Sequence, residues 1–576
     1  MRRRTLRVAL LSLLAPFGLA AQDSAPFDIV IANGRVLDGT GNPWFAADIG
    51  IRGDRIAAIG DLQGAPARRT IDARGQYVTP GFIGLHEHID RGILAGRTIV
   101  PNYLLQGFTT AVINADGLEG GIWPLRAQRD SLAKLGHSLN LVPMVSHGTV
   151  RRMVMGTTPA QVMRPATADE LRRMQALVRQ GMQEGAFGLT TGLEYNPMRY
   201  STTEELVALA KAVAEFGGHV QAHMRAQGRY SKWLLPSHMD HPTQKHVDWL
   251  DAIDEGITVA REAGVPFWFD HIHPKGPREW GISKATTETI RRAWEEGLRI
   301  YTNMHSYEGY AESVTLVPRW ALVRVEVPGM SMSDNFPPVD LSDWRGNMRR
   351  SLADPARRAM MVNDALYEIE RQGGAEGLLI RDFPDTTLRG RTLGEVARMR
   401  GLPLFETAVW LAENGFPDRL GGVVWTMRAV GMVDIEEWMR HDWNGVSLDR
   451  AVTDVASCSP YTHPGTWGTS GRLIRTFVYE RGTITLPYAI RSLTSVGAQA
   501  LRLSDRGLLR EGMRADVVVF DPETIGTDAT YLNPCVPQRG IVHVLVNGVP
   551  VVAAGEVTGA KPGRVFEPAR ARSGAP

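Results

Sequence analysis

Alternating apolar and polar positions, interrupted by turn residues, run through both ends of the chain. Residues 27–37 predict a strand, an Asn-Gly turn and a second strand, and residues 48–59 repeat this pattern around a Gly-Asp turn. Residues 515–521 and 544–552, near the opposite end, have the same strand-like pattern and contain another Asn-Gly pair. Because such pairs between alternating runs are typical of β-hairpins, we predict one small β domain formed from both ends of the chain.

Between the two β regions, strand-like hydrophobic runs alternate with helical segments. Residues 167–170 and 202–205 have the capping-box form ahead of periodic apolar runs, and the second helix is expected to stop at Gly217. Strand–helix alternation through residues 81–495 predicts a parallel α/β fold, most economically a (β/α)8 TIM-like barrel. The strand-like runs lie at residues 110–113, 141–145, 187–191, 219–222, 265–269 and 299–301.

The alternation of predicted strands and helices stops after Tyr307, where proline-containing loop segments begin. We interpret the region near residues 308–440 as an insertion that could cover the mouth of the barrel. The predicted domain limits follow from these changes of pattern. They are a leader at 1–21, the two parts of the β domain at 26–80 and 496–565, and the barrel at 81–495.

The first 21 residues have the form of a secretory signal peptide. A basic head with Arg2, Arg3, Arg4 and Arg7 precedes a short apolar run at residues 8–14 and a small-residue exit. The apolar run is too short to span a membrane, and no later run in the sequence approaches the required length of about 20 residues. We therefore expect a periplasmic or secreted protein without a membrane span in the mature chain.

Charge and cysteine content limit the partners and the stabilising chemistry. The chain has 576 residues and a formal net charge of +2, and removal of the leader takes away four arginines and no acid, which leaves 2 − 4 = −2. A nearly neutral protein offers no electrostatic basis for binding nucleic acid. Export permits a disulfide between Cys458 and Cys535, although two cysteines are too few for a disulfide scaffold.

Histidines and carboxylates stand where the predicted strands end. His86 and His88 follow a buried-looking strand, and residues two apart in a strand present their side chains to the same face. Active sites of β/α barrels lie at the ends of their strands, and imidazoles with carboxylates are what a hydrolytic metal site needs. The other candidates in chain order are Asp116, His147, Glu194, His223, His271, His273 and Asp454.

With these motifs in place, the sequence resembles the amidohydrolase superfamily, and within it the D-aminoacylase (N-acyl-D-amino-acid deacylase) branch. The resemblance implies a barrel flanked by a β-sandwich, one or two zinc ions, and hydrolysis of the amide of an N-acyl-D-amino acid by metal-activated water. This is a carbon–nitrogen bond other than a peptide bond. The matching segments are residues 78–88, 107–110, 146–151, 188–195, 223–225, 463–472, 506–508 and 512–516.

The resemblance also implies roles for individual residues. His86, His88 and His223 match metal ligands, and His273 is favoured over His271 because it stands just ahead of Lys275. Asp116 occupies the place of a metal-ligating cysteine, and a carboxylate there can still ligate or bridge zinc. Asp454 matches the aspartate of the last strand, which takes a proton from water and passes it to the leaving amine.

One departure from the family pattern concerns the substrate. The family has a His-Pro-Arg segment whose arginine binds the substrate carboxylate, whereas this chain has glycine at position 465. Glycine offers no guanidinium, so recognition of a carboxylate needs another arginine. The candidates for the substrate pocket are Arg151, Arg225 and Arg472, together with His147 and Tyr307.

Three functions remain open on these grounds. The first is a zinc-dependent hydrolase of an N-acyl-D-amino acid or a related small amide. The second is a cyclic-amide hydrolase or a dipeptidase on the same scaffold, which the glycine at position 465 favours. The third is a non-catalytic exported binding protein, which the presence of the catalytic aspartate together with the histidines argues against. Each expects a small-molecule partner, and a homo-oligomer is compatible with all three.

Overall fold

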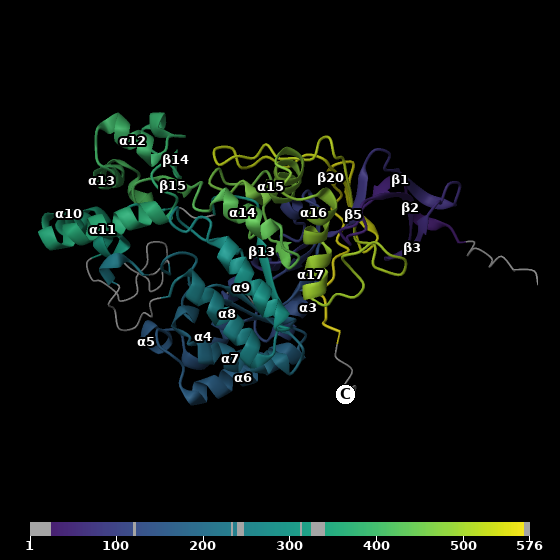
Figure 1. Cartoon of the computed structure of the whole chain (residues 1–576), viewed down its shortest axis with the longest axis horizontal. Helices are drawn as coiled ribbons and strands as arrows, with labels where there is room; N and C mark the ends of the chain where they lie inside the picture. The colour runs from purple at the N-terminus through teal and green to yellow at the C-terminus, as the bar shows by residue number, and fades with distance from the viewer. Residues whose placement is uncertain are drawn as a thin grey trace, which may run out of the picture.

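The computed structural model describes residues 25–118, 122–231, 234–238, 247–310, 314–323 and 340–569. The expected leader, residues 1–21, lies outside these ranges. Figure 1 shows a β-rich lobe made from both ends of the chain on one side of the molecule. A helical lobe with α10 to α13 lies on the opposite side, and a strand-and-helix body lies between them.

A nine-stranded sheet joins the two ends of the chain, as the hydrophobic pattern predicts. β5 pairs antiparallel with β17, with Val517 opposite Pro80, and this contact connects the two halves. The strand order is β20-β19-β18-β17-β5-β1-β2-β3, with β4 paired to β1. The strands are β1 (Phe27–Val36), β2 (Phe45–Arg52), β3 (Arg55–Gly60), β4 (Ala67–Asp72), β5 (Tyr77–Pro80), β17 (Val517–Phe520), β18 (Ile541–Val546), β19 (Val549–Ala553) and β20 (Glu556–Val557).

Two of the three predicted turns connect hairpin strands, and the first does not. The Gly-Asp pair joins β2 to β3, and the second Asn-Gly pair joins β18 to β19. The first Asn-Gly pair instead lies inside β1, where the pairing with β2 shifts register between Ile31 and Gly34. Asn33 adopts a φ of +62° there, and a Cβ at Gly34 would lie 2.5 Å from Val78 Cγ2. The pair therefore forms a bulge that lets β1 pass close to Val78.

Nine parallel strand segments form the body of the molecule in two sheets. One has the order β6-β7-β8 and the other β16-β13-β12-β11-β10-β9. Hydrogen bonds link the sheets on both sides: Phe187 N donates to Pro143 O at 3.0 Å, and Leu85 N donates to Val446 O at 3.2 Å. The segments are β6 (Phe82–Gly84), β7 (Phe108–Val112), β8 (Asn140–Val142), β9 (Val145–Ser146), β10 (Gly188–Gly192), β11 (His219–His223), β12 (Phe267–Phe269), β13 (Ile300–Met304) and β16 (Asn444–Val446).

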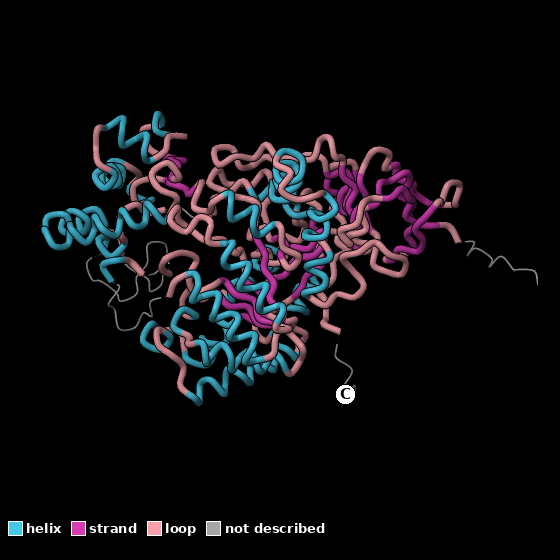
Figure 2. Tube along the Cα trace, in the orientation of Figure 1, coloured by secondary structure: helices cyan, strands magenta, loops and turns pink. Residues whose placement is uncertain are grey.

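Helices surround these parallel strands, which appear at the centre of Figure 2. The expected capping box at α6 is present, since Thr167 accepts from Glu170 N and Glu170 accepts from Thr167 N. At α7 only half of it forms: Thr202 caps Glu205 N at 3.2 Å, but the Glu205 carboxylate binds His147 and Arg151 instead. The helices are α1 (Asp90–Leu94), α2 (Pro101–Leu104), α3 (Leu125–Leu135), α4 (His147–Met155), α5 (Pro159–Val162), α6 (Ala168–Gln183), α7 (Thr203–Ala214), α8 (Trp249–Ala263), α9 (Ser283–Glu295), α14 (Met432–Met439), α15 (Gly465–Arg472), α16 (Leu486–Leu493) and α17 (Ser495–Ala500). None of the described helices is long and apolar enough to cross a membrane.

The helical lobe falls within the predicted insertion. It has its own apolar core, in which Trp320, Trp344 and Met361 are buried, and it contacts the loop after β16 through Arg381, which donates to Thr462 O at 3.1 Å. Its elements are α10 (Trp344–Ala353), α11 (Pro355–Arg371), α12 (Leu393–Arg400) and α13 (Leu404–Asn414), with the antiparallel pair β14 (Leu378–Asp382) and β15 (Val423–Thr426).

The two cysteines form a disulfide, which the sequence left open. Cys458 and Cys535 are 77 residues apart in the chain, with Cα atoms 5.8 Å from one another. A crosslink across a loop of this length stabilises the fold by about 4 kcal/mol in the chain-entropy description. It ties the loop that follows β16 to the segment that precedes β18.

Candidate metal-binding active site

The two histidines after β6 point toward one carboxylate. His86 is fully buried, and its Nδ1 lies 2.8 Å from Asp270 Oδ2. This contact leaves Nε2 of His86 facing Asp116 Oδ1 at 3.3 Å, and Nε2 of His88 lies 3.5 Å from Asp116 Oδ2. The second contact of an imidazole selects its tautomer, so Asp270 prepares His86 Nε2 to act as a ligand.

Asp116 lies at the centre of the site. It sits in a short turn after β7 with a φ of +59°, a conformation that Asp tolerates better than most residues. This turn conformation leaves Asp116 at the ligand position that the resemblance implies. One oxygen faces His88, and the other faces His86, His223 and His271.

Two further histidines approach Asp116 from β11 and from the loop after β12. His223 Nδ1 lies 3.7 Å and His271 Nε2 lies 3.8 Å from Asp116 Oδ1, and these two nitrogens are 3.0 Å apart. Nε2 of His223 lies 3.0 Å from Glu194 Oε2, which leaves Nδ1 to act as a ligand. Burial and the neighbouring His271 lower the pKa of His223 to about 4, so its imidazole is neutral at pH 7.

The structure corrects the choice between the two histidines after β12. His271, and not His273, joins Asp116 and His223 in a group whose ligand atoms lie within 4.8 Å of one another. His271 adopts a φ of +30°, so the chain leaves the strand geometry at this point and the two histidines no longer share a face. His273 instead packs against His305, with ring centroids 4.5 Å apart.

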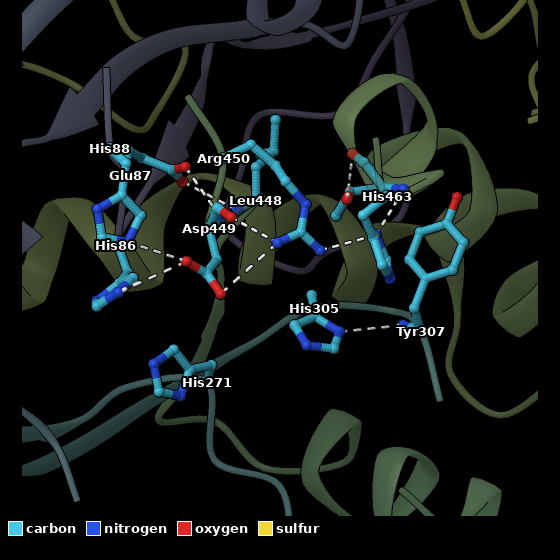
Figure 3. Close-up of polar contacts among 12 residues, drawn as sticks. His86, Glu87, His88, His271, His305, Tyr307, Leu448, Asp449, Arg450 and His463 are labelled. Carbon is cyan, nitrogen blue, oxygen red and sulfur yellow. Dashed lines mark hydrogen bonds and ion pairs between the residues drawn. The ribbon is translucent and has the colours of Figure 1, made fainter. Parts of the chain in front are cut away.

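The structure also corrects the aspartate. Asp454 lies on the surface with a 44% exposed side chain, where it accepts from Ser457 N at 2.7 Å and pairs with Arg97 at 3.3 Å. Asp449, in the loop just after β16, enters the site: its Oδ1 lies 3.1 Å from His88 Nε2 and 3.9 Å from His86 Nε2. Figure 3 shows Asp449 between these histidines and Arg450. Asp454 does not end a strand, because the last strand of the parallel sheets, β16, has already ended at Val446.

Glu87, between the two ligand histidines, holds Asp449 in place. The backbone N–H groups of Leu448 and Asp449 donate to its carboxylate at 2.9 Å and 3.1 Å, and the Tyr103 hydroxyl also donates to it. Burial raises the pKa of Glu87 to about 7 against these hydrogen bonds. Sequence reasoning missed this residue, although its place inside the His-x-His segment directs it away from the ligand face.

The buried donor set fits a divalent cation. His86 Nε2 and Asp116 Oδ1 are both buried, and neither has a hydrogen-bond partner among the described residues. Burial opposes ionisation of Asp116, but His86, His271 and His223 outweigh it and hold its pKa well below the ordinary value. Imidazole nitrogens and ionised carboxylate oxygens converging on one point are zinc ligands.

Two of the three arginines proposed for the substrate pocket, Arg151 and Arg225, are engaged elsewhere. Arg151 pairs with Glu205, and Arg225 pairs with Glu255 at 2.9 Å. His147 lies 2.9 Å from the same Glu205, and it belongs to this buried network rather than to the site around Asp116.

Arg472 and Tyr307 lie near one another beside the site. Arg472 donates to Ser306 O at 2.7 Å and lies 3.3 Å from Glu308. Its guanidinium stands over the Tyr307 ring, whose centroid lies 5.0 Å from that of His463. Of the residues proposed for substrate binding, Tyr307 therefore remains next to the polar groups drawn in Figure 3.

Comparison with known proteins places this geometry among metal-dependent hydrolases. The Amidohydrolase family matches residues 69–267 and 350–552. The D-aminoacylase of Alcaligenes xylosoxydans xylosoxydans is 29% identical over 571 residues, covering 95% of this chain and 99% of the relative. A solved D-aminoacylase with a binuclear metal centre is 27% identical with a TM-score of 0.68, covering 94% of this chain and 100% of that one. The N-acyl-D-glutamate deacylase of Bordetella bronchiseptica, solved with zinc and a phosphonate inhibitor, is 26% identical with a TM-score of 0.69 over the same shares.

Proposed function

The chain belongs to the amidohydrolase family, and on that premise we propose that it hydrolyses the amide bond of N-acyl-D-amino acids with the help of zinc. The observation that carries this proposal is the buried Asp116 carboxylate between two groups of histidines, with Asp449 beside them. The similar D-aminoacylase and N-acyl-D-glutamate deacylase support the substrate class by their names and by their similarity over nearly the whole chain.

Five residues offer the zinc ligands, with Asp449 beside them: His86, His88, Asp116, His223 and His271. Asp116 belongs to both groups, so the arrangement accommodates one ion or two. Zinc held there would polarise the amide carbonyl and lower the pKa of water toward neutrality. Asp270 and Glu194 orient His86 and His223 through the second ring nitrogen of each.

Asp449 is the residue that we assign to proton transfer. One of its oxygens faces the ligand histidines, and the other faces Arg450. Burial opposes ionisation of Asp449, but His88, Arg450 and His271 hold its pKa below the ordinary value. An ionised carboxylate here can take a proton from the attacking water and return it to the leaving nitrogen.

We further propose that the parallel strands close a (β/α)8 barrel and that the nine-stranded sheet curves into a β-sandwich. The hydrogen bonds that link the two parallel sheets on both sides support the closure. The domain limits that we propose are residues 26–80 and 496–565 for the sandwich, and 81–495 for the barrel with its insertion near 308–440.

We also propose export to the periplasm or beyond, with removal of residues 1–21. The basic head with its apolar run supports this, and so does the Cys458–Cys535 disulfide, because such bonds persist in oxidising compartments. Expression of the full-length chain in a bacterial host is expected to give an extracytoplasmic protein whose N-terminal sequence begins near Gln22. A cytoplasmic protein that keeps Met1 would contradict the proposal.

The substrate class is tested with two series of N-acetyl amino acids, one D and one L, and the zinc-loaded wild type. We expect release of free amino acid from the D series at about 100-fold higher kcat/KM than from the L series, because the chiral carbon lies beside the scissile bond. A chelator-treated preparation serves as the control. Zinc without release from either series would overturn the proposal in favour of a cyclic amide or dipeptide substrate.

A further inference from the structure

Arg450 is a buried arginine whose hydrogen-bonding capacity the protein leaves partly unused. Its side chain is 6% exposed, and it follows Asp449 directly in the chain. Nη1 donates to Asp449 O at 2.5 Å, and Nη2 donates to His463 Nδ1 at 2.7 Å. Its Nε–H is buried without a partner in the described part of the chain. A guanidinium presents five N–H groups, so this one can still receive an acceptor.

The positive charge of Arg450 is only weakly compensated. Within the described residues, its one ion-pair contact is Asp449 Oδ2 at 3.7 Å. Asp449 also faces His88 at 3.1 Å with its other oxygen, so this carboxylate is shared with the metal ligands. A buried charge without a close partner is destabilising, and a second anion would offset that penalty. The site is therefore arranged to receive a negatively charged group beside Arg450.

Arg450 also reaches the space next to Gly465. A Cβ at position 465 would lie 2.9 Å from His463 Nδ1, which is the atom that Arg450 Nη2 contacts. Gly465 N donates to this same Nδ1 at 2.9 Å, so His463 presents an unprotonated nitrogen and its Nε2–H donates to Gly309 O at 3.1 Å. The glycine thus leaves room at His463 for the guanidinium of Arg450, which lies in the loop after β16.

We infer that Arg450 binds the carboxylate of the N-acyl amino acid and makes a free carboxylate a requirement for efficient hydrolysis. This inference rests on the proposed function. In such a substrate only the nitrogen and Cα separate the scissile carbonyl carbon from the carboxylate carbon. Figure 3 shows the matching order in the protein. The ligand histidines after β6 lie on one side of Asp449, and Arg450 and His463 lie on the other. An α-carboxylate at Arg450 and a scissile carbonyl at the ligand histidines would therefore lie on opposite sides of Asp449.

The test compares one N-acetyl-D-amino acid that the wild type hydrolyses with its primary amide, which has the same acyl bond but no charge. We expect the wild type to prefer the acid in kcat/KM by about 100-fold, as for a charge-assisted pair in a buried site. In Arg450→Met this preference should fall to nearly one, mainly through a higher KM for the acid, while zinc content stays close to wild type. Because Arg450 also contacts Asp449, the readout is the ratio of acid to amide, in which any loss common to both substrates cancels. Arg97→Met, which removes an exposed arginine, is the matched control and should keep the preference.

The other outcomes are separable. A folded, zinc-loaded Arg450→Met that keeps the preference for the acid would overturn the inference. A wild type that hydrolyses acid and amide equally would also overturn it and leave the proposed function intact. A wild type that releases no amino acid from either the D or the L series of N-acetyl amino acids would refute the proposed function itself. If Arg450→Met does not fold, Arg450→Lys carries the test: a single charge without the planar fork should lower the preference about tenfold, and an unchanged preference would overturn the inference.

Discussion

Asp449→Asn is expected to lower kcat/KM by about 1,000-fold, whereas Asp454→Asn should stay within twofold of wild type. The first change removes the carboxylate that faces the ligand histidines, and general acid–base catalysis contributes about 100- to 10,000-fold. The second changes a half-exposed residue that caps Ser457. The measurement is release of amino acid from an N-acyl-D-amino acid, together with the zinc content of each protein.

The pair of variants distinguishes two aspartates that lie in the same loop and undergo the same chemical change. Zinc content is measured because Asp449 also lies near the metal ligands, and a loss of activity with zinc retained would assign it to proton transfer. Asp449→Asn with wild-type activity would refute its assignment. Loss of activity in Asp454→Asn would return the catalytic role to the residue that the sequence alone favoured.

Asp116→Ala is expected to weaken zinc binding by at least about 100-fold, since even residues that only orient metal ligands change affinity 10- to 100-fold. Asp116 is the one residue common to both groups of ligand atoms. Its removal therefore affects every ion in the site, whether the protein holds one or two. Zinc content after dialysis against a weak chelator measures the effect without relying on activity.

Asp116→Cys is the informative second variant. A thiolate is a strong zinc ligand, so this change should restore zinc binding even though it replaces a carboxylate. Asp454→Ala, with an aspartate removed at the surface, should leave zinc content unchanged. Full zinc retention by Asp116→Ala would show that Asp116 is only a turn residue, and the site would then have to be held by the histidines and Asp449.

Hydrophobic periodicity was sufficient to predict the elements whose local geometry is regular. The capping residue Thr167, the hairpin around Gly53 and the pairing of the two chain ends in one sheet follow from short-range rules of strands, turns and caps. His86 and His88 converge on Asp116 as the two-residue spacing predicts, although both follow β6, which ends at Gly84.

Residues that follow the strands were harder to place, because positive φ values break the alternation. His271 has a φ of +30°, and this turn brings it to Asp116 while His273 packs against His305. Asp449 has a φ of +58° near the start of the loop after β16, whereas Asp454 lies farther along this irregular loop. Counting spacings cannot distinguish these alternatives, since each depends on where the strand ends and how the chain turns.

The sequence by itself determined the α/β class, the pairing of both ends in one sheet, and the kinds of ligand at the metal site, because these depend on local pattern and residue chemistry. Only the tertiary structure decided which histidine and which aspartate complete the site. It also decided that Arg450 stands beside His463 while Arg151 and Arg225 are paired elsewhere. These choices depend on contacts between segments far apart in the chain, and such contacts leave no periodic signal in the sequence.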